Sequence, residues 1–93
     1  MRLLTEETVI EIGRITHFFA KIDVAVIELK NSLNVGETIV IKGPSTDFEQ
    51  VVDSMQIEHK NVQKAEAGQS VGLKVQQRVR ETDTVYKKGV TTQ

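Results

Sequence analysis

The chain of 93 residues has no cysteine and no tryptophan, and it has a single proline, Pro44. Without cysteine, neither a disulfide nor a thiolate metal site can form. Aromatic residues make up only 4% of the sequence, which argues against a surface that stacks single-stranded nucleic-acid bases. No apolar run reaches the roughly 18 residues of a membrane-spanning helix, and the N-terminus turns acidic too early for a signal peptide. We therefore expect a cytoplasmic protein without metal, cofactor or membrane contact.

Net charge gives little indication of a partner. The formal net charge is −1 at pH 7, so the whole chain exerts no overall pull on nucleic acid. Residues 51–93 hold seven Lys and Arg and five Asp and Glu, a balance of +2, whereas residues 1–50 hold five and eight, a balance of −3. A mixed, solvated surface accounts for this mild asymmetry, and a basic binding face in the second half is the alternative.

The length and composition are those of one small folded domain, with 39% hydrophobic and 27% charged residues. We expect this domain to span residues 9–87, after a flexible N-terminal tail over residues 1–8 and before a frayed C-terminus over residues 88–93. The tail is polar and unpatterned. A helix capped by Thr5 is the alternative, but no apolar stripe at helical spacing follows.

Short apolar segments separated by turn residues run through this domain, and no window has the 3.6-residue period of an amphipathic helix. Strands are expected at residues 9–18, 24–29, 38–42, 46–58, 70–75 and 84–87. The clearest alternation points three side chains to the interior: Val71, Leu73 and Val75. Such a series predicts an all-β sandwich or barrel, and a small closed barrel is favoured because closure leaves no exposed sheet edge.

The segment from Asn34 to Lys42 predicts a turn that feeds a strand. Gly36 suits a backbone position with positive φ, and Ile39 and Ile41 point to the same face of the strand that follows. Pro44 cannot donate a hydrogen bond to a sheet, so the strand should end just before it.

Two irregularities are expected in the other strands. Ile12 and Ile15 fall on different parities, and a bulge or close backbone approach at Gly13 would bring both to one face. Asp53 interrupts the apolar face of residues 46–58, which predicts a bend at that point.

Three segments, in this order and at compatible spacing, resemble the second domain of elongation factor Tu and its relatives. They are Gly13-Arg14-Ile15, Val35 to Ile41, and Ala65 to Leu73. The resemblance covers about residues 9–87, and it implies a six-stranded Greek-key β-barrel. The best overall match is to small stand-alone proteins named translation elongation factor-like.

A second resemblance is to the C-terminal barrel of the collagenase-like peptidases. It rests on Gly13-Arg14-Ile15, Asn34 to Lys42 and Gly43-Pro44. In that family the barrel is an accessory domain, and the peptidase site lies elsewhere. The resemblance therefore implies an accessory role.

The GTPase domain of full translation factors has no counterpart in this chain. Its phosphate loop has the pattern G-x-x-x-x-G-K-[ST], which does not occur here. Between Lys42 and Thr46 the lysine precedes the glycine, and no helix follows that could hold phosphate at its N-terminus. We expect no GTP binding. The partner barrel that completes the aminoacyl-tRNA site is also absent, so that site is not carried over to any residue.

Groups with catalytic chemistry are few and scattered. His17 and His59 lack metal-ligand spacing, and no serine lies in a G-x-S-x-G elbow. The paired carboxylates are expected to be solvated charges in exposed tails and loops: Glu6 with Glu7, and Glu81 with Asp83. We predict no catalytic residue and no metal ligand, and hence a protein that is not an enzyme.

Three cations form the best binding candidate. Arg78 and Arg80 share a parity, and Lys74 points outward on the preceding strand, so the three could contact RNA phosphates or a protein. Phe18 and Phe19 are adjacent and face opposite ways. One of them packs inside, and the other either tucks under a loop or marks a protein-docking patch.

The leading hypothesis is a binding module related to translation factors, which docks to a protein or to a ribonucleoprotein such as the ribosome. The alternative is an accessory barrel that acts in trans with a collagenase-like peptidase. The oligomeric state does not follow from the sequence.

Overall fold

The computed structural model describes the backbone of residues 5–92 and the side chains of residues 9–88, and it consists of strands joined by turns and loops. The strands are β1 (Thr5–Phe19), β2 (Val24–Leu29), β3 (Leu33–Asn34), β4 (Thr38–Gly43), β5 (Thr46–Val51), β6 (Met55–Ile57), β7 (Lys60–Val62), β8 (Lys64–Ala65), β9 (Ser70–Lys74) and β10 (Thr84–Thr92). Residues 5–92 include no helix long and apolar enough to cross a membrane. The all-β prediction is confirmed.

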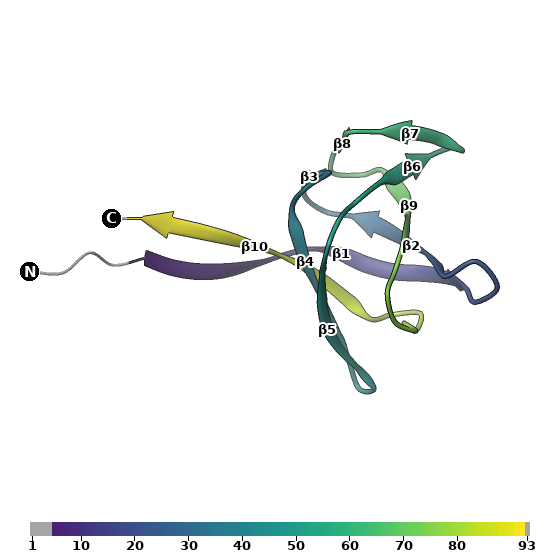
Figure 1. The fold of residues 1–93 in the computed structure, drawn as a ribbon, viewed down its shortest axis with the longest axis horizontal. Helices are drawn as coiled ribbons and strands as arrows, with labels where there is room; N and C mark the ends of the chain where they lie inside the picture. The colour runs from purple at the N-terminus through teal and green to yellow at the C-terminus, as the bar shows by residue number, and fades with distance from the viewer. Residues whose placement is uncertain (1–4, 93) are drawn as a thin grey trace, which may run out of the picture.

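The prediction of a closed six-stranded Greek-key barrel is wrong, because the main sheet is open. Eight strands follow the order β5-β4-β10-β1-β2-β9-β6-β7, and β3 pairs with β8 in a second sheet of two strands (Figure 1). The main sheet curls around the core, but its edge strands β5 and β7 are not joined to each other. The chain bends between Val51 and Met55, so that β6 and not β5 pairs with β9.

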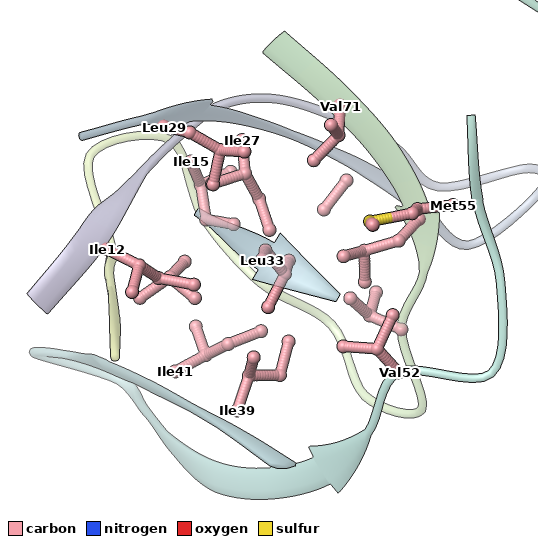
Figure 2. Packing of buried hydrophobic residues seen from close by; sticks show 14 of the residues in the cluster. Ile12, Ile15, Ile27, Leu29, Leu33, Ile39, Ile41, Val52, Met55 and Val71 are labelled. Carbon is pink, nitrogen blue, oxygen red and sulfur yellow. The ribbon is translucent and has the colours of Figure 1, made fainter. Parts of the chain in front are cut away.

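Aliphatic side chains from both halves of the chain fill the interior (Figure 2). Every inward position named above is buried: Ile39, Ile41, Val71, Leu73 and Val75. The fully buried side chains also include Ile12, Ile15, Ile27, Leu33, Met55 and Val85. Burial of this apolar surface is the main favourable term for a domain so small.

Both explanations offered for Gly13 hold. The register of β1 against β10 shifts between Glu11 and Gly13, which is the bulge that brings Ile12 and Ile15 inside together. A Cβ at Gly13 would also clash with the carbonyl oxygen of Glu28, so only glycine fits where these two backbones approach each other. A second register shift, between Ile15 and His17, was not predicted.

The predicted bend in residues 46–58 is confirmed, because β5 ends at Val51 and β6 begins at Met55. Val52 lies buried between them and exchanges backbone hydrogen bonds with the turn before β4. Its N–H donates to the carbonyl of Glu37 at 2.9 Å, and its carbonyl accepts the N–H of Gly36 at 2.8 Å.

Strand boundaries at the chain ends differ from the prediction. The tail expected over residues 1–8 and the frayed end expected over residues 88–93 contain paired strand, with Thr5 opposite Thr92. Residues 1–4 and 93 lie outside the described residues. Backbone pairing does not depend on an apolar pattern, so polar side chains gave no signal for it. The short strands β3 and β7 were not predicted either.

Three turns share one hydrogen-bond geometry. In each, the N–H of the fourth residue donates to the carbonyl of the first, and the side chain of the fourth accepts the N–H of the first. The turns are Asn34 to Glu37, Glu66 to Gln69, and Arg80 to Asp83. The third residue has positive φ each time: 97° at Gly36, 91° at Gly68 and 76° at Thr82.

Thr82 is strained in this shared geometry, because a β-branched residue rarely adopts the left-handed region. We predict that Thr82→Gly raises the free energy of unfolding by about 1 kcal/mol, the backbone strain outweighing the entropy that glycine adds to the unfolded chain. Gly68→Ala in the matched turn should lower it by about 1 kcal/mol. No atom lies within 4 Å of a Cβ at Gly68, so that cost comes from the backbone alone. Urea unfolding measures both, and a loss of stability in Thr82→Gly would contradict the shared geometry.

Candidate functional site

The three predicted cations lie on one exposed stretch of chain. Lys74 is the last residue of β9, and Arg78 and Arg80 lie in the segment that leads to β10. Val79, between the two arginines, is buried in the core and fixes them on the outer side. The backbone N–H of Arg80 donates to Oδ2 of Asp83 at 2.9 Å, which anchors the end of the stretch. A role for these cations in binding stays a prediction.

Lys74 does not lie in a purely basic environment. It lines a hollow of about 420 Å³, together with the carboxylates Asp23 and Asp53 and with Ser54 and Gln76. Two aspartates in the lining of this hollow disfavour a phosphate inside it. The surroundings of Lys74 therefore suit a mixed polar protein surface better than an RNA backbone.

Gln50 closes the gap between β5 and β9 above this hollow. Its Nε2 donates to the carbonyl of Lys74 at 2.9 Å, and its Oε1 accepts the N–H of Gln76 at 2.8 Å. The side chain is only 7% exposed, so these two bonds are largely shielded from water. One side-chain amide thus makes two hydrogen bonds to the backbone, as a neighbouring strand would. Gln50 was not identified from the sequence, since a side chain that bonds to backbone in place of a strand leaves no periodic pattern.

Glu81 and Asp83 do not form the exposed pair expected from the sequence. Glu81 is exposed, but Asp83 is only 1% exposed. Besides accepting the N–H of Arg80, the Asp83 carboxylate fills the space where Gly43 has no side chain. The prediction of a solvated Asp83 was wrong because a carboxylate bonded to backbone N–H can be buried. The side chains of Glu6 and Glu7 lie outside the described ones.

Glu58, His59 and Ser70 line one hollow, but among the described side chains no hydrogen bond joins them. His17 and His59 are both exposed, and His17 Nδ1 lies 3.8 Å from a carboxylate oxygen of Glu81. In that part of the chain no three His, Asp or Glu side chains come together as a metal site would require.

An apolar hollow of about 280 Å³ lies at the far end of β1. Phe18 packs against the core, whereas Phe19 is 50% exposed and stands beside Ile22, which is 59% exposed. Val24 and Gly72 also line the hollow. Of the two alternatives for the adjacent phenylalanines, the structure favours an exposed Phe19.

The bridge made by Gln50 leads to a prediction about stability. Gln50→Ala leaves the carbonyl of Lys74 and the N–H of Gln76 without their partners, and we expect a loss of about 1–3 kcal/mol in the free energy of unfolding. Gln56→Ala is the matched control, since Gln56 bonds Asn61 at an exposed position, and it should change the free energy by less than about 0.5 kcal/mol. Equal effects of the two substitutions, measured by urea unfolding, would rule out the bridging role.

Comparison with known proteins distinguishes between the resemblance to elongation factor Tu and the resemblance to collagenase-like peptidases. No family model matches the chain. The chain is 51% identical over 78 residues to the uncharacterized protease MJ0090 of Methanocaldococcus jannaschii, covering 83% of this chain and 19% of that protein. It is 34% identical over 80 residues to a collagenase of Porphyromonas gingivalis, covering 84% of this chain and 19% of the collagenase. The chain thus spans about a fifth of the length of the curated relatives it matches.

The fold has a solved counterpart. The crystal structure of the C-terminal domain of a Geobacillus thermoleovorans protein, described as a U32 peptidase, superposes with a TM-score of 0.80 at 20% identity. The match covers 85% of this chain and 92% of that domain. These findings support the resemblance to the accessory barrel of collagenase-like peptidases and give no support to the one with elongation factor Tu. The chain is therefore similar in sequence to part of a protease and of a collagenase, and it has the fold of a U32 peptidase C-terminal domain.

Proposed function

We propose that the chain is a non-catalytic accessory domain that works with a collagenase-like catalytic partner. The observation that carries this proposal is the 51% identity over 78 residues to a segment that makes up only 19% of a protease. That segment covers 83% of this chain. The shared fold with a U32 peptidase C-terminal domain points the same way.

The chemistry of the described side chains supports an accessory role. A cluster of hydrophobic side chains, most of them aliphatic, fills the interior (Figure 2). The hollow beside Lys74 combines two carboxylates with one ammonium, and the hollow beside Phe19 is mainly apolar. Among the described side chains, no hydrogen bond joins His59 to Glu58 or Ser70 in the second hollow, as a catalytic triad would require.

Two observations argue against the alternative function, which is docking to a ribonucleoprotein through Lys74, Arg78 and Arg80. The relatives found by comparison are peptidases and collagenases. In addition, Asp23 and Asp53 lie beside Lys74 and oppose a phosphate there.

Capture from an extract of the native cell tests the proposal. The affinity-tagged chain should retain a collagenase-like peptidase, identified by mass spectrometry. The triple variant Lys74→Ala, Arg78→Ala and Arg80→Ala should retain the same peptidase, because the proposed partner is not held by phosphate contacts. An unrelated tagged β-domain of similar charge controls for adhesion to the resin.

The outcome that would contradict the proposal is equally specific. The tagged chain would then capture ribosomal proteins at low salt, this binding would fall steeply with added salt, and the triple variant would lose it. Together these results would replace the accessory role with docking to a ribonucleoprotein.

A further inference from the structure

The paired ends of β1 and β10 extend beyond the body of the sheet. The two strands pair from Thr5 with Thr92 down to Arg14 with Thr84, with one bulge between Glu11 and Gly13. On the outer side of β1, β2 pairs only from Gly13 onward, and on the outer side of β10, β4 pairs only up to Lys87. Residues 5–10 and 88–92 thus form a two-stranded ribbon, whose tip projects beyond the other strands (Figure 1). At its base, Lys88 Nζ donates to Oε1 of Glu49 in β5 at 3.0 Å.

This ribbon has the features of an element that is covered in a complex. Within the described sheet no strand pairs with either of its outer edges, so each edge presents backbone groups to which a further strand can bond. Val9 is 50% exposed and Ile10 is 44% exposed. Because they are adjacent in a strand, they point to opposite faces, so each face of the ribbon carries an exposed aliphatic side chain. A ribbon of two strands alone is only marginally stable in water.

The relatives indicate what covers it. The matched segment is 19% of the length of two relatives, and the solved counterpart is the C-terminal domain of its own protein, so the rest of that protein precedes the strand equivalent to β1. Both ends of the described chain lie at the free tip of the ribbon (Figure 1). In a relative so arranged, the catalytic part would join the accessory domain at that tip and lie against the ribbon.

We propose that the ribbon is the docking element for the catalytic part of a U32-type peptidase. The catalytic part adds a strand along one free edge of the ribbon and buries Val9 and Ile10. This inference rests on the proposed function, which it deepens by naming the surface through which the partner binds.

The position of the other exposed features fits this arrangement. At about 3.3 Å per residue, the 15 residues of β1 extend over roughly 45 Å, so Phe19 and Ile22 lie at the opposite end of the domain from the ribbon. A partner on the ribbon leaves that apolar end uncovered. The two ends therefore provide a matched pair of variants, with side chains of similar exposure.

Binding of the captured peptidase, purified, to the chain and to two double variants tests the inference. Val9→Ser with Ile10→Ser should raise Kd at least tenfold, because each substitution removes an aliphatic contact from the interface. Phe19→Ser with Ile22→Ser should leave Kd within about twofold. Each variant should unfold within a few degrees of the unchanged chain, since all four side chains are exposed in the free domain.

Each result separates the inference from the proposed function. If the unchanged chain binds no peptidase, the proposed function fails and the inference fails with it. If the chain binds and the ribbon variant binds equally well, or if only the Phe19 and Ile22 variant loses binding, the domain is an accessory partner but docks elsewhere. If the chain sediments as a dimer that only the ribbon variant disrupts, while peptidase binding is kept, the ribbon is occupied by a second copy and the inference is overturned.

Discussion

The pairing of the first strand with the last holds this structure together. β1 lies between β10 and β2, and β10 lies between β1 and β4, so the two chain ends supply the middle of the eight-stranded sheet. The other strands of the main sheet pair with β1 or β10 directly, or are linked to them through intervening strands. The chain must close its longest loop before this pair can form, which costs entropy that local contacts do not repay. The bulge at Gly13 then turns Ile12 and Ile15 inward from the same strand.

The sequence predicts the interior of the fold because burial leaves a period of two residues in a strand. Ile39 with Ile41, and Val71 with Leu73 and Val75, were placed correctly in this way. The bulge at Gly13 was predictable because a register shift there brings Ile12 and Ile15, which have different parities, to the same face. The openness of the sheet was not predictable. The edge strand β5 is linked to β9 and Gln76 through the side-chain amide of Gln50, and a side-chain contact of this kind leaves no periodic pattern in the sequence.

The candidate site was predicted less well than the fold, because a surface depends on segments that are distant in sequence. Lys74, Arg78 and Arg80 are exposed as expected, but Asp23 and Asp53 come beside Lys74 from other parts of the chain. The ends of β1 and β10 gave no signal either, since their pairing is made by the backbone of a polar stretch. Resemblance by short motifs pointed to two families at once. Only comparison over most of the chain favoured the peptidases.

The central claim is that the β1–β10 pair both holds the sheet together and extends from it to bind a catalytic partner. Amide hydrogen exchange, measured on the free chain and on its complex with the captured peptidase, tests this most directly. In the free chain, the amides of residues 5–10 and 88–92 that point to the ribbon's outer edges should exchange fast, while those of the buried sheet stay protected. In the complex, one outer edge of the ribbon should become protected. Unchanged exchange in the ribbon, with new protection confined to residues 74–80, would contradict the account.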